Sequence, residues 1–104
     1  MLKRDKILLK IKEVVNRTDP DSVVYLYGSR ARRKSTTHSD WDILILINRQ
    51  EIPFEFETKL MDAIYELEVE TGEVISPLIY TKSEWNNHSY TPLYENVIRE
   101  GVLI

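Results

Sequence analysis

An unbroken apolar run, Ile43 to Ile47, limits most strongly what this chain can fold into. Isoleucine and leucine alternate along it, so an extended backbone would present two apolar faces. Such a strand has to be covered on both sides, as in the middle of a sheet that lies between helices. We therefore expect a mixed α/β (α+β) domain with residues 42–47 as its central strand.

The spacing of apolar residues predicts a helix on either side of this strand. The first occupies the opening segment and is broken at Pro20, because proline cannot continue a helix. The second starts with Pro53 as its first helical residue and stops at Gly72. Its inward stripe is predicted to be Phe56, Leu60, Ala63, Ile64 and Leu67.

Two further apolar segments, residues 23–27 and 73–80, are predicted to be strands. The C-terminal segment 102–104 is a candidate fourth strand, which gives a small mixed sheet of three or four strands. Thr81 and Glu84 have the spacing of a capping box, and Thr91-Pro92 is a typical start for a last helix. The inward residues of that helix are predicted to be Leu93, Val97 and Ile98.

The 104 residues fit one domain, residues 1–104. Cysteine is absent, which excludes disulfides and thiolate chemistry and suits a reducing cytoplasm. The start of the chain is charged and no long apolar run follows it, so we expect neither a signal peptide nor a membrane span.

The net charge of −3 is unevenly distributed along the chain. Residues 1–52 carry eleven Lys or Arg against seven Asp or Glu, whereas residues 53–104 carry three against ten. Such a split predicts one face for a polyanion and another for a basic partner, or simply two solvated faces. The overall acidity argues against a stable nucleic-acid partner.

Asp40 and Asp42 lie two residues apart at the entrance to the central strand. In an extended chain they point to the same face, so both carboxylates can reach one divalent cation. Oxygen ligands suit Mg²⁺, which also binds the phosphates of a substrate. Trp41 would point the other way. Taken alone, two aspartates at this spacing are more often a turn residue and a solvated strand end.

Gly28-Ser29 follows the strand at 23–27 and opens a predicted helical turn. Glycine lets the backbone approach a phosphate closely, and the serine hydroxyl adds a donor. Two neighbouring strands would bring this pair and the aspartates to one edge of the sheet, as transfer of a phosphoryl-type group requires. The basic residues between them could add positive charge there, or could be solvated: Arg30, Arg32, Arg33 and Lys34.

The fifteen residues from Gly28 to Asp42 resemble the signature of the DNA polymerase β-like nucleotidyltransferases, a Gly-Ser, a spacer and an Asp-x-Asp. Ala31, Arg32 and Ser39 also fall on the pattern. The branch that the stretch resembles most is the minimal nucleotidyltransferases, small prokaryotic proteins often paired with a HEPN-domain toxin. The predicted order of elements extends the resemblance over most of the chain.

The resemblance implies transfer of a nucleoside monophosphate, usually AMP from ATP, with Mg²⁺ as cofactor. Asp40 and Asp42 would be catalytic metal ligands. The nucleoside triphosphate would be bound by Gly28, Ser29, Arg32 and Ser39. In toxin-paired relatives the acceptor is a tyrosine of the toxin, so a HEPN-type protein partner is implied; the small size of the chain also predicts a homo-oligomer or a complex.

The chain departs from the family pattern at two positions. Arg33 stands where glycine is usual. Ser76 stands where active relatives carry a third carboxylate, and Glu73, three residues earlier, falls on the opposite face of an ideal strand unless a bulge intervenes. Two hypotheses therefore remain open: an active nucleotidyltransferase, or a weak or inactive one that masks its partner.

Overall fold

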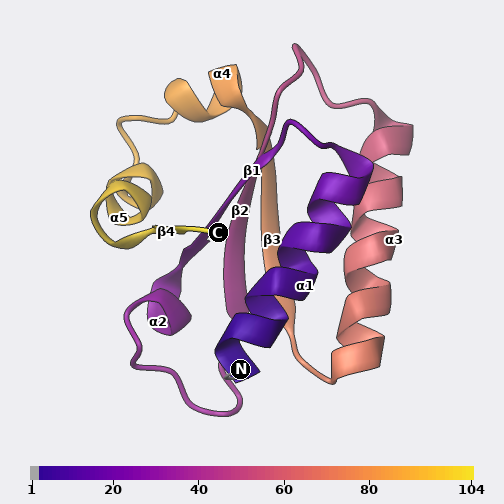
Figure 1. Ribbon diagram of the computed structural model, residues 1–104. Helices are drawn as coiled ribbons and strands as arrows, with labels where there is room; N and C mark the ends of the chain where they lie inside the picture. Colours follow the sequence, from indigo (N-terminus) through magenta and orange to yellow (C-terminus); the bar gives the residue numbers. More distant parts are fainter. Residues whose placement is uncertain (1–2) are drawn as a thin grey trace.

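The computed structural model describes residues 3–104 and contains one four-stranded sheet in the order β3-β2-β1-β4 (Figure 1). Its strands are β1 (Val23–Tyr27), β2 (Trp41–Ile47), β3 (Ile75–Thr81) and β4 (Val102–Leu103). β1 is antiparallel to both β2 and β4, whereas β2 and β3 are parallel. The predicted mixed fold is confirmed, and the C-terminal segment does add a fourth strand.

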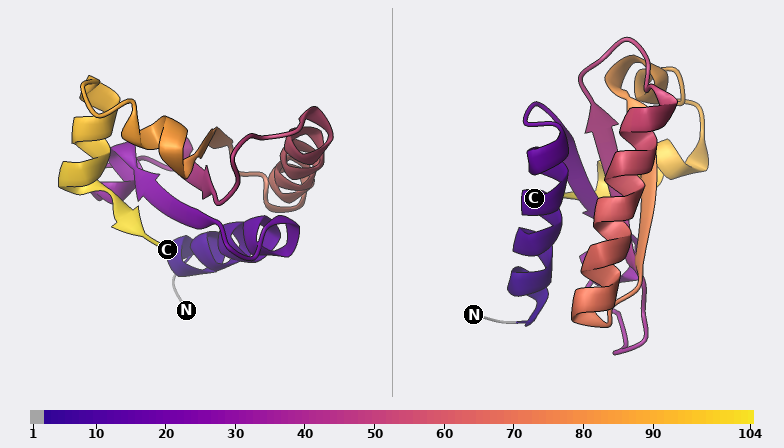
Figure 2. Two further views of the ribbon diagram at one scale, coloured as in Figure 1. Left: turned by 90° about the horizontal axis from the view of Figure 1, so that it is seen from above. Right: turned by 90° about the vertical axis from the view of Figure 1, so that its right-hand side faces the viewer.

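Two long helices, α1 (Lys3–Thr18) and α3 (Phe54–Thr71), cover one face of the sheet (Figure 2). α1 buries Ile7, Leu8, Ile11 and Val15, and α3 buries Leu60, Ile64 and Leu67. They pack on the isoleucines of β2, which all point to this side. Burial of these apolar side chains is the main stabilising term of the layer.

The other face of the sheet is covered by two shorter helices, α4 (Lys82–Asn86) and α5 (Pro92–Glu100). Leu44 and Leu46 of β2 pack there against Trp85 of α4 and Val97 of α5. Residues 43–47 of β2 are therefore buried on both faces, as its unbroken apolar sequence predicts.

Local sequence signals fix most ends of these elements. Gly72 ends α3 in the left-handed conformation, and Thr81 with Glu84 forms the predicted capping box of α4. Pro53 is not the first helical residue as predicted; it has extended backbone angles and α3 begins one residue later, at Phe54. β3 likewise begins at Ile75, two residues after the predicted start.

One core prediction is wrong. Ile98, expected to face inward from α5, has 66 % of its side chain exposed. α5 lies over the edge of the sheet near β1 and β4, and its contact with that edge is centred on Val97. A narrow contact of this kind leaves the neighbouring residue in solvent.

No helix within residues 3–104 combines the length and the hydropathy needed to cross a membrane. Residues 1 and 2, which belong to the charged N-terminal segment, lie outside the residues that the structure describes.

Substitution of Ile64 by alanine should lower the free energy of unfolding by about 2–5 kcal/mol, because the side chain is only 2 % exposed and its loss leaves a cavity. Val69→Ala on the same helix is the matched control, since Val69 is 68 % exposed. Chemical denaturation of both variants checks this. Equal losses would show that the side of α3 that packs on the sheet is wrongly assigned.

Candidate functional site

The two halves of the sequence signature meet where β1 ends and β2 begins. Gly28 opens α2 (Gly28–Ala31) directly after β1, and its neighbour Tyr27 pairs with Asp42 across the two strands. Asp42 precedes Leu44 and Leu46 on the face covered by α4 and α5, whereas Trp41 points into the opposite layer and is 1 % exposed. The predicted orientations are thus confirmed.

Gly28 is held against the Asp42 carboxylate. Its φ is +76°, in the left-handed region that favours glycine, and a Cβ atom built there would collide with Oδ2 of Asp42. Two independent constraints therefore require glycine at this position. They bring the backbone that the signature assigns to phosphate binding into contact with a candidate metal ligand.

Ser76 of β3 completes the group at this edge. It is the register partner of Asp42 across the parallel β2–β3 pair, and its hydroxyl donates a 3.0 Å hydrogen bond to Oδ2 of Asp40. The register 75–81 is continuous, so no bulge turns another residue to this position. The place that the family pattern gives to a third carboxylate is thus occupied by a hydroxyl that holds Asp40.

Glu73 does not supply the missing carboxylate. It lies on the other side of the sheet, paired with Lys3 at 2.5 Å and 3.9 Å from Arg30. A hydrogen bond from Lys3 holds the pKa of Glu73 below its usual range despite its burial. The hypothesis that Glu73 joins the aspartates is therefore corrected by the structure.

The two aspartates repel each other. Burial, and next the adjacent Asp40 carboxylate, raise the pKa of Asp42, while Arg32 acts in the opposite direction. Burial, followed by the charge of Asp42, also raises the pKa of the neighbouring Tyr27 hydroxyl to about 12. The site thus carries negative charge that the protein compensates only in part.

This donor set fits a magnesium ion. Within residues 3–104 no three His, Cys, Asp or Glu side chains come together as a metal cluster, so a bound ion would rely on Asp40 and Asp42. Two carboxylates are what Mg²⁺ commonly takes from a protein when water and phosphate oxygens complete its octahedron. The raised pKa of Asp42, which burial and next the Asp40 carboxylate cause, agrees, because a nearby cation would offset both effects.

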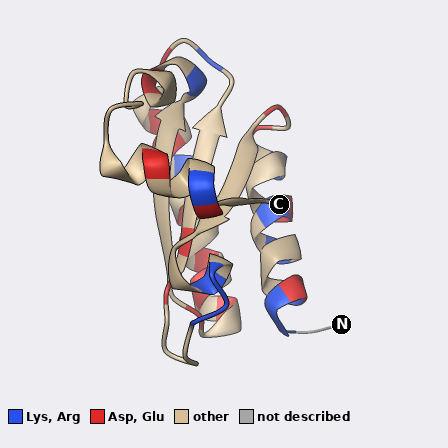
Figure 3. Ribbon diagram, turned by 90° about the vertical axis from the view of Figure 1, so that its left-hand side faces the viewer, with Lys and Arg blue, Asp and Glu red and all other residues tan. Residues whose placement is uncertain are grey.

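Basic residues gather at the end of the molecule that carries α2 and the first turn of α1 (Figure 3). Arg32 is close enough to Asp42 to lower its pKa, and its guanidinium forms a 2.9 Å ion pair with Glu100 of α5. Arg30, in contrast, stacks on Trp41 at 4.3 Å and donates to the carbonyl oxygen of Ser39. Arg30 is thus directed away from the aspartates, contrary to its suggested place beside the phosphates.

The remaining signature residues shape the loop before Asp40. The Ser39 hydroxyl accepts a 2.9 Å hydrogen bond from the Thr36 backbone N–H, and the Ser29 carbonyl accepts one from Lys34. His38 is exposed. Ser29 and Ser39 therefore lie at the predicted edge of the sheet, and their contact with a nucleotide stays a prediction.

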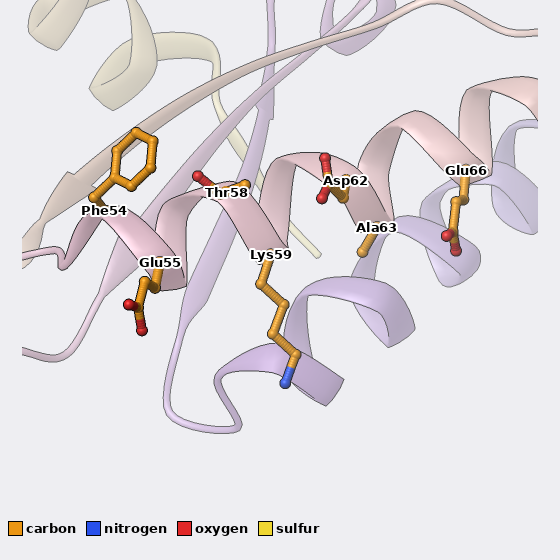
Figure 4. Close-up of a pocket in the computed structure, with 7 residues that line it drawn as sticks. All are labelled: Phe54, Glu55, Thr58, Lys59, Asp62, Ala63 and Glu66. Atoms are coloured by element: carbon orange, nitrogen blue, oxygen red, sulfur yellow. The ribbon is translucent and has the colours of Figure 1, made fainter.

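A shallow hollow of about 490 Å³ lies elsewhere, along the outer side of α3 (Figure 4). Its lining includes the carboxylates Glu55, Asp62 and Glu66 but a single cation, Lys59. A triphosphate would be repelled there, so this hollow is not a candidate nucleotide site.

Sequence reasoning missed two contacts that support the site, the Arg30–Ser39 hydrogen bond and the Arg32–Glu100 ion pair. The second joins residues 68 positions apart, and no local pattern predicts it. The first spans nine positions, but its geometry depends on how the loop between α2 and β2 folds back on Trp41.

The sequence profile of one protein family, described as polymerase beta nucleotidyltransferase, matches residues 9–104. The chain therefore belongs to the polymerase beta nucleotidyltransferase family, as the signature between Gly28 and Asp42 predicts. No curated protein matches the sequence.

Solved structures share this fold at low sequence identity. A mutant of the MntA–HpeT toxin–antitoxin has 19 % identity and a TM-score of 0.62, over all of this chain and 72 % of that one. A toxin–antitoxin with AMP-PNP has 18 % identity and a TM-score of 0.65, over 98 % and 72 %. A candidate minimal nucleotidyltransferase has 20 % identity and a TM-score of 0.62, over 97 % and 95 %. At these identities the likeness shows a shared fold.

The contact between Gly28 and Asp42 can be tested by a double-mutant cycle. Gly28→Ala should destabilise the fold by about 2–4 kcal/mol, because it adds a collision with Asp42 to the strain of a positive φ. Combined with Asp42→Ala, the same change should cost only the strain, about 1–2 kcal/mol.

Gly72→Ala is the matched control for this cycle. Gly72 has a φ of +73° but open space where its Cβ would be, so its substitution reports strain alone. Additive losses from Gly28→Ala and Asp42→Ala in urea denaturation would contradict the close approach of the two residues.

The raised pKa of Asp42 predicts how the stability of the fold depends on pH. A group that binds its proton more tightly in the folded state makes the fold more stable as the pH falls through its raised pKa. Without metal, Asp42→Asn should therefore be more stable than wild type at neutral pH, by a few tenths to about 1 kcal/mol.

This difference should shrink when the pH is lowered and wild-type Asp42 becomes protonated. Thermal unfolding of both proteins from neutral to acid pH measures it. A less stable Asp42→Asn at neutral pH would contradict the raised pKa of Asp42.

Proposed function

We propose that this chain is a nucleotidyltransferase that moves AMP from ATP to a hydroxyl of a protein partner with Mg²⁺ bound at Asp40 and Asp42. One observation carries the proposal: the Gly28 backbone and the Asp42 carboxylate are in contact at one edge of the sheet. A cation held by the two aspartates would then lie beside the backbone that receives the phosphates.

The structural neighbours support the class of substrate and partner. One of them contains AMP-PNP, an ATP analogue, and two are toxin–antitoxin structures. The signature resembles the branch whose members are paired with HEPN-type toxins, and we extend that pairing to this chain. The proposed setting is cytoplasmic, with no stable nucleic-acid partner.

The roles of the residues follow from their places. Gly28 and Ser29 would donate to the triphosphate, Arg32 would exchange Glu100 for a phosphate oxygen, and Ser39 would contact the nucleotide from the loop. The acceptor oxygen forms a bond to the α-phosphorus while the bond to pyrophosphate breaks. The bound cation would neutralise charge on the phosphates. Asp40 or Asp42 would take the acceptor's proton.

Ser76 favours a second candidate function, a masking module that binds the partner without efficient transfer. A neutral hydroxyl is a weaker Mg²⁺ ligand than a carboxylate and cannot act as the base. The hydrogen bond from Ser76 also uses one oxygen of Asp40. Both effects would reduce turnover while nucleotide and partner binding remain.

A transfer assay separates the two functions. The chain is incubated with labelled ATP, Mg²⁺ and the protein encoded by the adjacent gene. If the chain is a transferase, that protein should become labelled, and the label should be absent when the Asp42→Asn variant is used. A stable complex of the two proteins without label would support masking and contradict transfer.

Substitutions at Ser76 show what the missing carboxylate means for the rate. Ser76→Asp should raise transfer by about ten-fold or more if base catalysis is limiting. Ser76→Ala is the matched control, because it frees Asp40 without adding a charge, and it should change the rate only slightly. A fall in rate with Ser76→Asp would show that the serine itself is required.

A further inference from the structure

A second polar pocket lies on the opposite side of β2 from the aspartates. It has a volume of about 250 Å³ and lies between the start of α1 and the loop after α2, which pass close to each other at the lower end of the molecule in Figure 1. Its lining residues are Lys3, Arg4, Arg30, Arg33, Ser35 and Trp41.

The charge of this pocket is strongly positive. Four cations line it, and the carboxylate at its border is Glu73, which Lys3 contacts at 2.5 Å and which lies 3.9 Å from Arg30. Among the ion pairs of residues 3–104, none involves Arg4 or Arg33. Guanidinium groups without a counter-charge attract an anion.

One residue that lines the pocket has a buried donor that lacks an acceptor. Within the described chain, Nε of Arg4 and Nε1 of Trp41 are buried and make no hydrogen bond by geometry. The Trp41 side chain nevertheless faces the Glu73 carboxylate and, after Lys3, lowers the pKa of Glu73, so Nε of Arg4 is the donor left without an acceptor. Unpaired buried donors are rare in folded proteins, and a ligand with several acceptor oxygens would satisfy this one.

Arg33, which lines this pocket, has a left-handed backbone conformation that residues other than glycine rarely adopt. Its φ of +57° is the only positive value at a non-glycine residue in residues 3–104, and it costs about 1–2 kcal/mol. Glycine would adopt this conformation without strain. A strained cation that lines a cationic pocket indicates that its charge is used there.

We infer that this pocket binds a compact phosphate anion, such as inorganic phosphate or pyrophosphate, at a site separate from the nucleotide edge. One guanidinium group can donate two parallel hydrogen bonds to a phosphate. Three arginines, Arg4, Arg30 and Arg33, line this pocket of about 250 Å³. The site goes beyond the proposed transfer and does not depend on it. Arg30 also donates to the Ser39 carbonyl, so the anion would brace the loop that leads to Asp40.

Calorimetric titration without divalent cations tests the pocket directly, with phosphate, pyrophosphate and ATP as separate ligands. Wild type should bind phosphate or pyrophosphate at physiological salt. Arg33→Gly should weaken this binding about ten-fold or more, because a charged hydrogen-bond donor is lost, while its melting temperature stays equal or rises. Lys34→Gly removes the same charge from the same loop outside the pocket, so it should change the affinity less than two-fold.

The variant Asp42→Asn separates this site from the nucleotide edge and should bind phosphate or pyrophosphate as wild type does. Equal affinities of Arg33→Gly and wild type would overturn the assignment, as would loss of binding in Asp42→Asn. Binding of ATP alone would also overturn it, because the pocket would then not recognise a bare phosphate anion.

Discussion

The contact between the Gly28 backbone and the Asp42 carboxylate is the constraint on which the site depends. It requires a residue without a Cβ at the end of β1, and it fixes where the first carboxylate of β2 points. The buried leucines of β2 and the helices α4 and α5 behind them hold this face of the sheet in place. The core packing thus holds the Gly28 backbone and the Asp42 carboxylate closer together than a residue with a Cβ atom at position 28 would allow.

Much of this arrangement could be predicted because its signals are local. Alternation in β2 separates Trp41 from Asp42. The odd spacing of three residues predicts Glu73 and Ser76 on opposite sides of the sheet, and they do lie so although β3 begins only at Ile75. Only the parallel register of β2 and β3 shows that Ser76 lies opposite Asp42 and bonds to Asp40. The sequence predicts that a serine replaces the third carboxylate, whereas its contact with Asp40 is visible only in the structure.

The features that escaped prediction depend on distant parts of the chain. Arg30 lies between the two candidate metal ligands and the glycine in sequence, yet its side chain turns to Trp41 and the layer under α1. Ile98 fits a helical stripe, yet α5 meets the sheet over too narrow an edge to bury it. The spacing of apolar residues predicts which side of a helix or strand faces the core. How many of those residues become buried depends on the area of the surface that the element packs against.

Gly28 and the two aspartates are proposed to hold a cation and a triphosphate together. The most direct measurement is the affinity for a non-hydrolysable ATP analogue with and without Mg²⁺, in wild type and in Asp42→Asn. We predict binding that strengthens at least about ten-fold with Mg²⁺ in wild type and loses this dependence in the variant. Binding that is unaffected by Mg²⁺, or that keeps its Mg²⁺ dependence without the Asp42 carboxylate, would contradict the claim.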